Sequence, residues 1–158
     1  LGYVTESVSA SAPEGPAESV GATLAESALA MKMQPGRNCL ISGGEPVVSL
    51  VDESIRGRGG RNQQLVLAAM KRLAGDVRDV VLLSGGTDGE DGPTDAAGAL
   101  CDIETLTGAE NAGLDIDDHL RRNDAYHFFL PLDSLIFTGP TNTNVCDLRV
   151  VLTDSPAS

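Results

Sequence analysis

The chain has 158 residues, of which 41% are hydrophobic and 22% are charged, which is enough for one compact domain with its own core. Eleven basic and twenty-three acidic residues give a net charge of −12. Such a charge repels nucleic acids and anionic membranes, so we expect neither as a partner. No apolar run approaches the ~20 residues that a membrane-spanning helix needs. The three cysteines have no CxxC spacing, which favours reduced thiols in a cytoplasmic protein over a disulfide framework or a zinc site.

In the first half of the chain, apolar segments alternate with glycine- and proline-rich breaks. The apolar side chains recur at helical spacing from residue 17 to 33, and Pro35-Gly36 ends this run. A second helix is expected over residues 61–74, because one face collects its apolar side chains. Strands are predicted at residues 2–9, 39–41 and 47–51, with a glycine-rich turn at 42–45 and a basic loop at 57–60.

The second half contains the clearest strand, Val80-Val81-Leu82-Leu83. This continuous apolar run is typical of a strand buried on both faces of a parallel sheet. A long polar loop follows it over residues 84–95. Helices are then expected at residues 104–112 and 117–122, and strands at 135–137 and 148–152. These elements predict an α/β fold with a mixed or mostly parallel sheet flanked by helices.

The loop before the second helix reads Gly57-Arg58-Gly59-Gly60-Arg61-Asn62-Gln63-Gln64. Glycines at a helix start let backbone N–H groups converge on an anion, and an arginine adds a fork suited to phosphate or carboxylate. The loop matches neither the Walker pattern nor the dinucleotide fingerprint, whose third glycine is replaced by Asn62. The residues alone leave two interpretations open, an anion site and a helix entry with a solvated arginine.

The loop over residues 84–95 leaves the end of the clearest strand, where open α/β sheets bind ligands. Its carboxylates could hold Mg²⁺, although the order of an EF-hand is not met. Asp88 directly follows the small residues at the strand end, which favours a functional role, whereas Glu90 is expected to face water. Asp91 and Asp95 flank Gly92-Pro93-Thr94, where a carboxylate can hold its own turn or cap the next segment.

The loop over residues 138–145 alternates threonines and asparagines. Such side chains suit a sugar acid or a phosphate, and they equally suit turns of their own backbone. His119 and His127 are too far apart in sequence to indicate a ligand pair. Phe128 and Phe129, beside Tyr126, are expected in the core.

These loops together resemble the carboxyl-terminal half of the glycerate 2-kinase family, also named hydroxypyruvate reductase, whose terminal segment is called the MOFRL domain. The blocks that carry the resemblance occur in the family's order: Ser42-Gly43-Gly44-Glu45, Gly59-Gly60-Arg61-Asn62-Gln63, Ser84-Gly85-Gly86-Thr87-Asp88-Gly89, Asp91-Gly92-Pro93-Thr94-Asp95-Ala96-Ala97-Gly98, Asn123-Asp124, and Thr138-Gly139-Pro140-Thr141 with Thr143-Asn144-Val145.

The resemblance implies a single domain of a two-domain enzyme, with the active site in the cleft between the halves. It implies ATP-dependent, Mg²⁺-assisted phosphorylation of D-glycerate at the 2-hydroxyl. We then expect residues 1–38 to be a bridging strand and helix from the missing amino-terminal half, and residues 39–158 to be a MOFRL-like α/β domain. The chain begins with Leu1 instead of Met, which fits part of a longer chain that is inactive alone.

Carried over residue by residue, the resemblance implies two catalytic residues. Arg61 would offset charge on the transferring phosphoryl group or hold the glycerate carboxylate. Asp88 would accept the proton of the substrate hydroxyl or bind Mg²⁺. The implied substrate-binding residues are Glu45, Asn62, Thr141 and Asn144, and the implied cofactor-binding residues are Gly59 and Gly60. Of these, Glu45 would orient Arg61 or the metal.

The sequence departs from the family pattern at three places. Pro46-Val47-Val48-Ser49 replaces a usual Thr-Thr-Val-Thr, Gln64 replaces a glutamate, and Asn142 replaces a glycine. Two other functions remain alternatives. Hydroxypyruvate reduction would need a nicotinamide fingerprint, which the chain lacks. A stand-alone binding module would keep the fold without the kinase partner.

Overall fold

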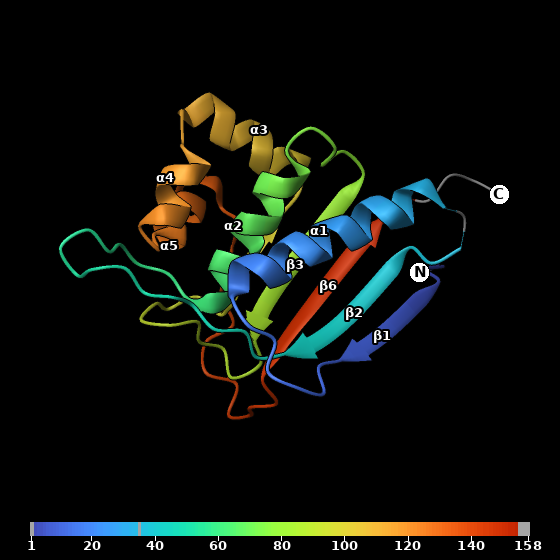
Figure 1. Ribbon diagram of the computed structural model, residues 1–158, viewed down its shortest axis with the longest axis horizontal. Coiled ribbons are helices and arrows are strands. Elements are labelled where there is room, and N and C mark those ends of the chain that lie inside the picture. Colours follow the sequence, from blue (N-terminus) through green and yellow to red (C-terminus); the bar gives the residue numbers. More distant parts are fainter. Residues whose placement is uncertain (1, 35, 155–158) are drawn as a thin grey trace.

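The computed structural model describes residues 2–34 and 36–154, which form a six-stranded sheet with helices packed on it (Figure 1). The strand order is β1-β2-β6-β3-β4-β5. The strands are β1 Thr5–Ser9, β2 Cys39–Gly44, β3 Val80–Gly86, β4 Gly98–Cys101, β5 Leu135–Ile136 and β6 Asp147–Thr153. The helices are α1 Ala17–Met33, α2 Arg61–Leu73, α3 Ile103–Ala112, α4 Ile116–Arg121, α5 Ala125–Phe129 and the 3-10 helix η1 Leu130–Leu132.

The sheet is mixed, which confirms the predicted α/β class. β1 and β2 pair in parallel, and the other neighbouring strands pair antiparallel. The four helices predicted at residues 17–33, 61–74, 104–112 and 117–122 are α1 to α4, displaced by at most one residue at each end. Among the described helices, none is both long and apolar enough to cross a membrane.

The two faces of the sheet differ, as β6 shows. Asp147, Arg149 and Val151 are buried on the face that α1 and α2 cover (Figure 1). Leu148 points to the opposite face and is 45% exposed. The core therefore lies between one face of the sheet and the helices. Tyr126, Phe128 and Phe129 belong to this core, as expected, and Cys39, Cys101 and Cys146 are free thiols.

The prediction that Val80–Leu83 runs in a parallel sheet is wrong. β3 is antiparallel to both of its neighbours, β4 and β6. Its burial alternates, and Val81 is 38% exposed. A short apolar run has the same composition in both settings, so it does not reveal which strands lie beside it.

The predicted turn at residues 42–45 is also wrong, because β2 continues through Gly44, and β3 likewise continues through Gly86 into the predicted loop. The glycines in these strands permit close approach instead of a turn. A Cβ atom on Gly44 would overlap the Glu14 carboxylate, and one on Gly86 would lie 2.6 Å from the Glu90 carbonyl oxygen.

Residues 47–51 do not form the predicted strand. They belong to the loop between β2 and α2, where Val47 and Leu50 are exposed and only Val47 makes an isolated bridge, to Pro16. Three described elements were not predicted, the four-residue β4, the five-residue α5 and the three-residue η1. All are short, and β4 begins with the small residues Gly98 and Ala99, which carry little strand signal.

The division at residue 38 stays a prediction, although β1 and α1 share the sheet and the core with the rest of the described chain. α1 packs closely on α2, which is buried on nearly all sides. At their crossing, a Cβ atom on Gly21 would overlap the backbone carbonyl of Leu65. A rigid backbone atom cannot yield as a side chain can, so Gly21 sets how close the two helices lie.

Replacing Gly21 by alanine should destabilise the fold by about 1–3 kcal/mol, although alanine is the better helix former. The melting temperature should fall by roughly 5 °C. Gly108→Ala in α3 is the matched control, because its Cβ would meet only the flexible Leu132 side chain, at 3.1 Å. Equal melting temperatures for the two variants would show that the α1–α2 contact tolerates a methyl group.

Candidate functional site

Two strand ends of the same sequence flank the start of β6. Ser42-Gly43-Gly44 of β2 and Ser84-Gly85-Gly86 of β3 lie in register on either side of Asp147-Leu148-Arg149. Gly44 and Gly86 are both partners of Asp147, the first residue of β6. β2 and β3 therefore end where β6 begins. We call this end of the three strands the edge of the sheet, and Asp147 lies at its centre.

Asp147 fixes the position of Arg61, the first residue of α2. The Arg61 guanidinium donates from Nε to Oδ2 at 2.8 Å and from Nη2 to Oδ1 at 3.0 Å. This pairing raises the pKa of Arg61, with burial acting in the opposite direction. Glu45 lies 3.2 Å from Nη1, on the outer side. The Asp147 side chain is fully buried, whereas that of Arg61 is 33% exposed, so Asp147 anchors a cation that still reaches the surface.

Sequence reasoning gave Glu45 the task of orienting Arg61 and did not single out Asp147. The signal was present, since Asp147 directly precedes a predicted strand at a sheet edge. The same kind of signal had identified Asp88 at the end of β3. Both carboxylates contact the Arg61 guanidinium, and the bidentate contact comes from Asp147.

Asn62 is completely buried behind Arg61. Its Nδ2 donates to Asp91 at 3.2 Å and to Asp147 at 3.1 Å, and its Oδ1 accepts from the Ser84 hydroxyl. Its predicted contact with substrate stays a prediction. In the structure its side chain belongs to the network that links α2 to β3 and β6.

Asp91 occupies the start of α2. Its carboxylate accepts the backbone N–H of Asn62 at 3.0 Å and of Gln63 at 2.9 Å. Burial raises the pKa of Asp91, while these helix N–H groups oppose the rise. Gly60 is buried against it, and a Cβ there would overlap the carboxylate. The anion bound at this helix end is therefore the chain's own side chain, and a cofactor contact by Gly59 and Gly60 stays a prediction.

The structure brings Asp88, Thr141 and Asn144 together, as the predicted site requires. Asn144 Nδ2 donates to Asp88 Oδ2 at 3.1 Å, and the Thr141 backbone N–H donates to the Asp88 carbonyl at 3.0 Å. Asp88 Oδ1 accepts from the Glu90 N–H at 3.2 Å. Asp88 is partly exposed, and Glu90 is exposed, as expected. The loop before β6 thus folds back onto the end of β3.

Residues 144–147 connect the two clusters. Asn144 binds Asp88, Cys146 Sγ lies 3.8 Å from Glu45, and Asp147 binds Arg61. A groove of about 490 Å³ adjoins this segment, with Glu45, Arg61 and Cys146 in its wall. Apolar residues also line it: Ala10, Ala12, Pro13, Pro46 and Val47. The arrangement thus presents a cation and a carboxylate cluster along one edge of the sheet.

The described residues contain no group of three histidine, cysteine or acidic side chains that could by itself hold a metal ion. A Mg²⁺ ion that arrives on nucleotide phosphates needs only one or two protein carboxylates. Asp88 fits this requirement, because each of its oxygens has one protein donor and room for a second partner.

Asn123 and Asp124 hold the loop that leads to Arg61. The Asn123 amide oxygen accepts the Val51 N–H at 2.9 Å, and the Asp124 carboxylate accepts the Arg58 N–H at 2.8 Å. Burial alone would raise the pKa of Asp124. The hydrogen bond from Arg58 and the contact with His127 outweigh burial, so the pKa of Asp124 is lowered. This pair was visible only as a block of the family pattern, because its partners lie about seventy residues away.

Comparison with known proteins identifies the family of proteins to which this fold and this site belong. The profile of the MOFRL family matches residues 38–147, and the chain belongs to that family. Its fold matches the crystal structure of a glycerate kinase from Thermotoga maritima, with a TM-score of 0.86 and 38% identity over 97% of this chain and 37% of that one.

The individual relatives carry three names. A glycerate kinase from Danio rerio is 48% identical over 74% of this chain and 24% of its own length. A D-glycerate 2-kinase from Thermotoga maritima is 46% identical over 72% of this chain and 26% of its own length. A putative hydroxypyruvate reductase from Agrobacterium vitis is 39% identical over 88% of this chain and 37% of its own length. The chain thus spans about a quarter of the length of the first two relatives.

Replacing Asp91 by alanine should destabilise the fold by roughly 2 kcal/mol, because it removes the cap of α2 and a partner of Asn62. Asp95→Ala is the matched control. Asp95 had been a second candidate cap, yet within residues 2–34 and 36–154 its carboxylate accepts only the Tyr126 hydroxyl, at 2.8 Å, and the residue is exposed. Urea unfolding measures both. A larger loss for Asp95→Ala would contradict this assignment of the cap.

Proposed function

We propose that the protein to which this chain belongs transfers the γ-phosphoryl group of ATP to the 2-hydroxyl of D-glycerate. The observation that carries the proposal is the edge of the sheet at which Asp147 anchors Arg61 and the loop before β6 meets Asp88. Similarity to proteins named glycerate kinase and D-glycerate 2-kinase supports it. Glycerate is the small-molecule partner, and an amino-terminal half supplies the remaining wall of the cleft. We place the protein in the cytoplasm, which suits its three free thiols.

Arg61 is the group that meets the anionic part of the substrates. A guanidinium has five N–H groups, and three of those of Arg61 contact Asp147 and Glu45. The two that remain, on Nη1 and Nη2, are available to a phosphoryl or carboxylate oxygen. Because Asp147 fixes the plane of the guanidinium beforehand, binding requires little further ordering of the side chain.

Asp88 is the carboxylate that acts on the substrate hydroxyl. Its two oxygens are held by Asn144 and by the Glu90 N–H, so its position is fixed while one lone pair on each oxygen remains. It accepts the proton of the 2-hydroxyl as that oxygen attacks phosphorus, or it holds the Mg²⁺ ion. When bound, Mg²⁺ would neutralise charge on the phosphate oxygens. Thr141 and Asn144 shape the same loop next to the substrate.

Hydroxypyruvate reduction is the second enzymatic candidate, and one relative bears that name. The reaction needs a bound nicotinamide. In the dinucleotide fingerprint the third glycine permits close packing at a helix start, where this chain has the buried Asn62. The stand-alone binding module is the third candidate. Kinase activity of the whole protein separates the first candidate from the other two, and reduction of hydroxypyruvate by a nicotinamide cofactor separates the second from the third.

Asp88→Asn in the whole protein should lower turnover by about a hundredfold or more, because it removes the charge but keeps the shape and the bond from Asn144. Glu90→Gln, two residues away and exposed, is the matched control and should retain activity. Formation of ADP, with melting temperatures for both variants, measures the effect. An active Asp88→Asn together with an inactive Glu90→Gln would show that the catalytic carboxylate is Glu90 and that its assignment to Asp88 is wrong.

A magnesium titration of Asp88→Asn separates its two roles. A metal ligand would show a raised half-saturating Mg²⁺ concentration, whereas a base would show lowered turnover at saturating Mg²⁺.

The 158-residue chain alone should show no phosphorylation of D-glycerate by ATP. Phosphoryl transfer depends on holding both substrates in line, and a single wall of a cleft does not position them. Incubation of the purified chain with ATP, Mg²⁺ and D-glycerate tests this, with the whole protein as the positive control. Turnover by the chain alone would show that all the machinery lies within it.

A further inference from the structure

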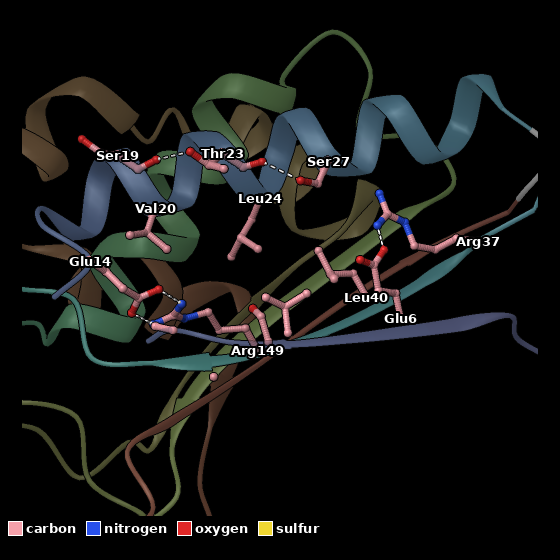
Figure 2. Close-up of a pocket in the computed structure, with 14 residues that line it drawn as sticks. Glu6, Glu14, Ser19, Val20, Thr23, Leu24, Ser27, Arg37, Leu40 and Arg149 are labelled. Atoms are coloured by element: carbon pink, nitrogen blue, oxygen red, sulfur yellow. Dashed lines mark hydrogen bonds and ion pairs between the residues drawn. The ribbon is translucent and has the colours of Figure 1, made fainter. Parts of the chain in front are cut away.

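The sheet has a second apolar face, on the side away from α1 and α2. Figure 2 shows the first, covered face, where Leu24 of α1 and Leu40 of β2 lie between the helix and the sheet. The strand register places a different set of side chains on the opposite face, which we call the open face. In β2, β3 and β6 its large side chains are Ile41, Val81, Leu83, Leu148, Val150 and Leu152.

The open face is not part of the hydrophobic core. The core formed by the described residues takes in Val151 of β6 from the covered face, but none of these six side chains. Leu148 is 45% exposed and Val81 is 38% exposed, and the other four are partly exposed. Leu100 of β4 and Ile136 of β5 extend the aliphatic surface across the sheet.

The composition of the open face is that of a protein interior. A mostly antiparallel sheet that keeps one face in water carries polar side chains on that face. In β3 and β6 the corresponding positions are aliphatic or glycine, and polar side chains occur only in β1, at Thr5, Ser7 and Ser9. In the six strands that the structure describes, no position on this face is charged, although 22% of the chain is charged. Such a face is typical of a surface that another layer covers.

Two observations argue against a second copy of the chain as that layer. Each copy carries a net charge of −12, which opposes association of two copies. Four strands at about 4.8 Å spacing, with five residues at about 3.3 Å each, outline an aliphatic area of roughly 300 Å². Each partner in a stable dimer buries about 800 Å².

The side chains also differ from those of a surface that docks a separate protein. Such surfaces are enriched in aromatic side chains, methionine and arginine, and the strand positions of the open face have none of these. A segment of the same polypeptide fits better. Its covalent link gives it a high effective concentration, so that a small aliphatic area is enough to hold it. The relatives are long enough to supply one, because this chain spans only about a quarter of the length of the first two.

We propose that two amphipathic helices of the amino-terminal half pack on the open face, so that the sheet lies between two layers of helices in the whole protein. A helix is about 10 Å wide and covers two strands, so two helices cover β2, β6, β3 and β4. α1 and α2 already cover the other face as a packed pair. The proposal rests on the part of the proposed function in which an amino-terminal half completes the protein.

Labelling of an introduced cysteine with N-ethylmaleimide tests this. Val81→Cys places a thiol on the open face, and Leu130→Cys is the matched control, because Leu130 is 48% exposed at the start of η1. In the chain alone both thiols should react. In the whole protein Val81→Cys should react at least about tenfold more slowly, and Leu130→Cys should react as before. The added mass above that of the unsubstituted protein measures the rate, at protein concentrations from about 1 to 100 μM.

A charge at the same position gives a second measurement. Val81→Asp should lower the melting temperature of the whole protein by about 10 °C, because the helices would bury an unpaired carboxylate. In the chain alone the same substitution should cost only a few degrees, since Val81 is exposed there. Leu130→Asp, the control, should have a small effect in both.

Three results would overturn the proposal. Equal labelling rates of Val81→Cys in the chain and in the whole protein would show that the amino-terminal half leaves the face open. Protection that is lost on dilution, as the whole protein dissociates, would assign the face to a second copy. Slow labelling in the chain alone would show that the face is closed without any added layer. Kinase activity enters none of these measurements, so an inactive whole protein with a protected Val81→Cys would contradict the proposed function alone.

Discussion

The bond between Arg61 and the buried Asp147 is the interaction on which the edge of this sheet depends. A fully buried carboxylate is costly unless charged and polar partners surround it. Asp147 has three such contacts, two from Arg61 and one from Asn62. They hold the start of α2 against the start of β6, and Asn62 extends the link to Ser84 of β3. The glycines that end β2 and β3 leave room for other neighbours, the Glu14 carboxylate beside Gly44 and the Glu90 carbonyl beside Gly86.

The same pairing limits what this chain can do with anions. Arg61 and Arg149 are each matched by a carboxylate, Asp147 or Glu14. The net charge is −12. A phosphoryl group in transfer needs positive charge around it. Under the proposed function most of that charge comes from Mg²⁺ and from the amino-terminal half, while Arg61 supplies a fixed, partly neutralised contact.

The sequence was sufficient for elements whose signal is local. The helical spacing of residues 17–33 and 61–74 predicted α1 and α2. The family resemblance, and not a local signal, grouped Asp88, Thr141 and Asn144 in one site, where Asn144 donates to Asp88. The sequence was insufficient where the answer depends on distant partners. Whether Val80–Leu83 lies in a parallel or antiparallel pair is decided by β6, about seventy residues later. The place of Asn62 inside the protein is decided by Asp91 and Asp147, which no spacing near residue 62 indicates.

The loop over residues 57–64 shows why a glycine-rich helix entry is ambiguous. Phosphates and carboxylates both present oxygen atoms to the N–H groups of a first helical turn, and glycine permits both to approach. Here Asp91 takes that position, and a Cβ at Gly60 would overlap it. Gly57 is limited in the same way by Asp124. The glycines therefore accommodate carboxylates of the chain itself. These carboxylates fix the backbone from which Arg61 projects, so the loop serves the proposed reaction by positioning that residue.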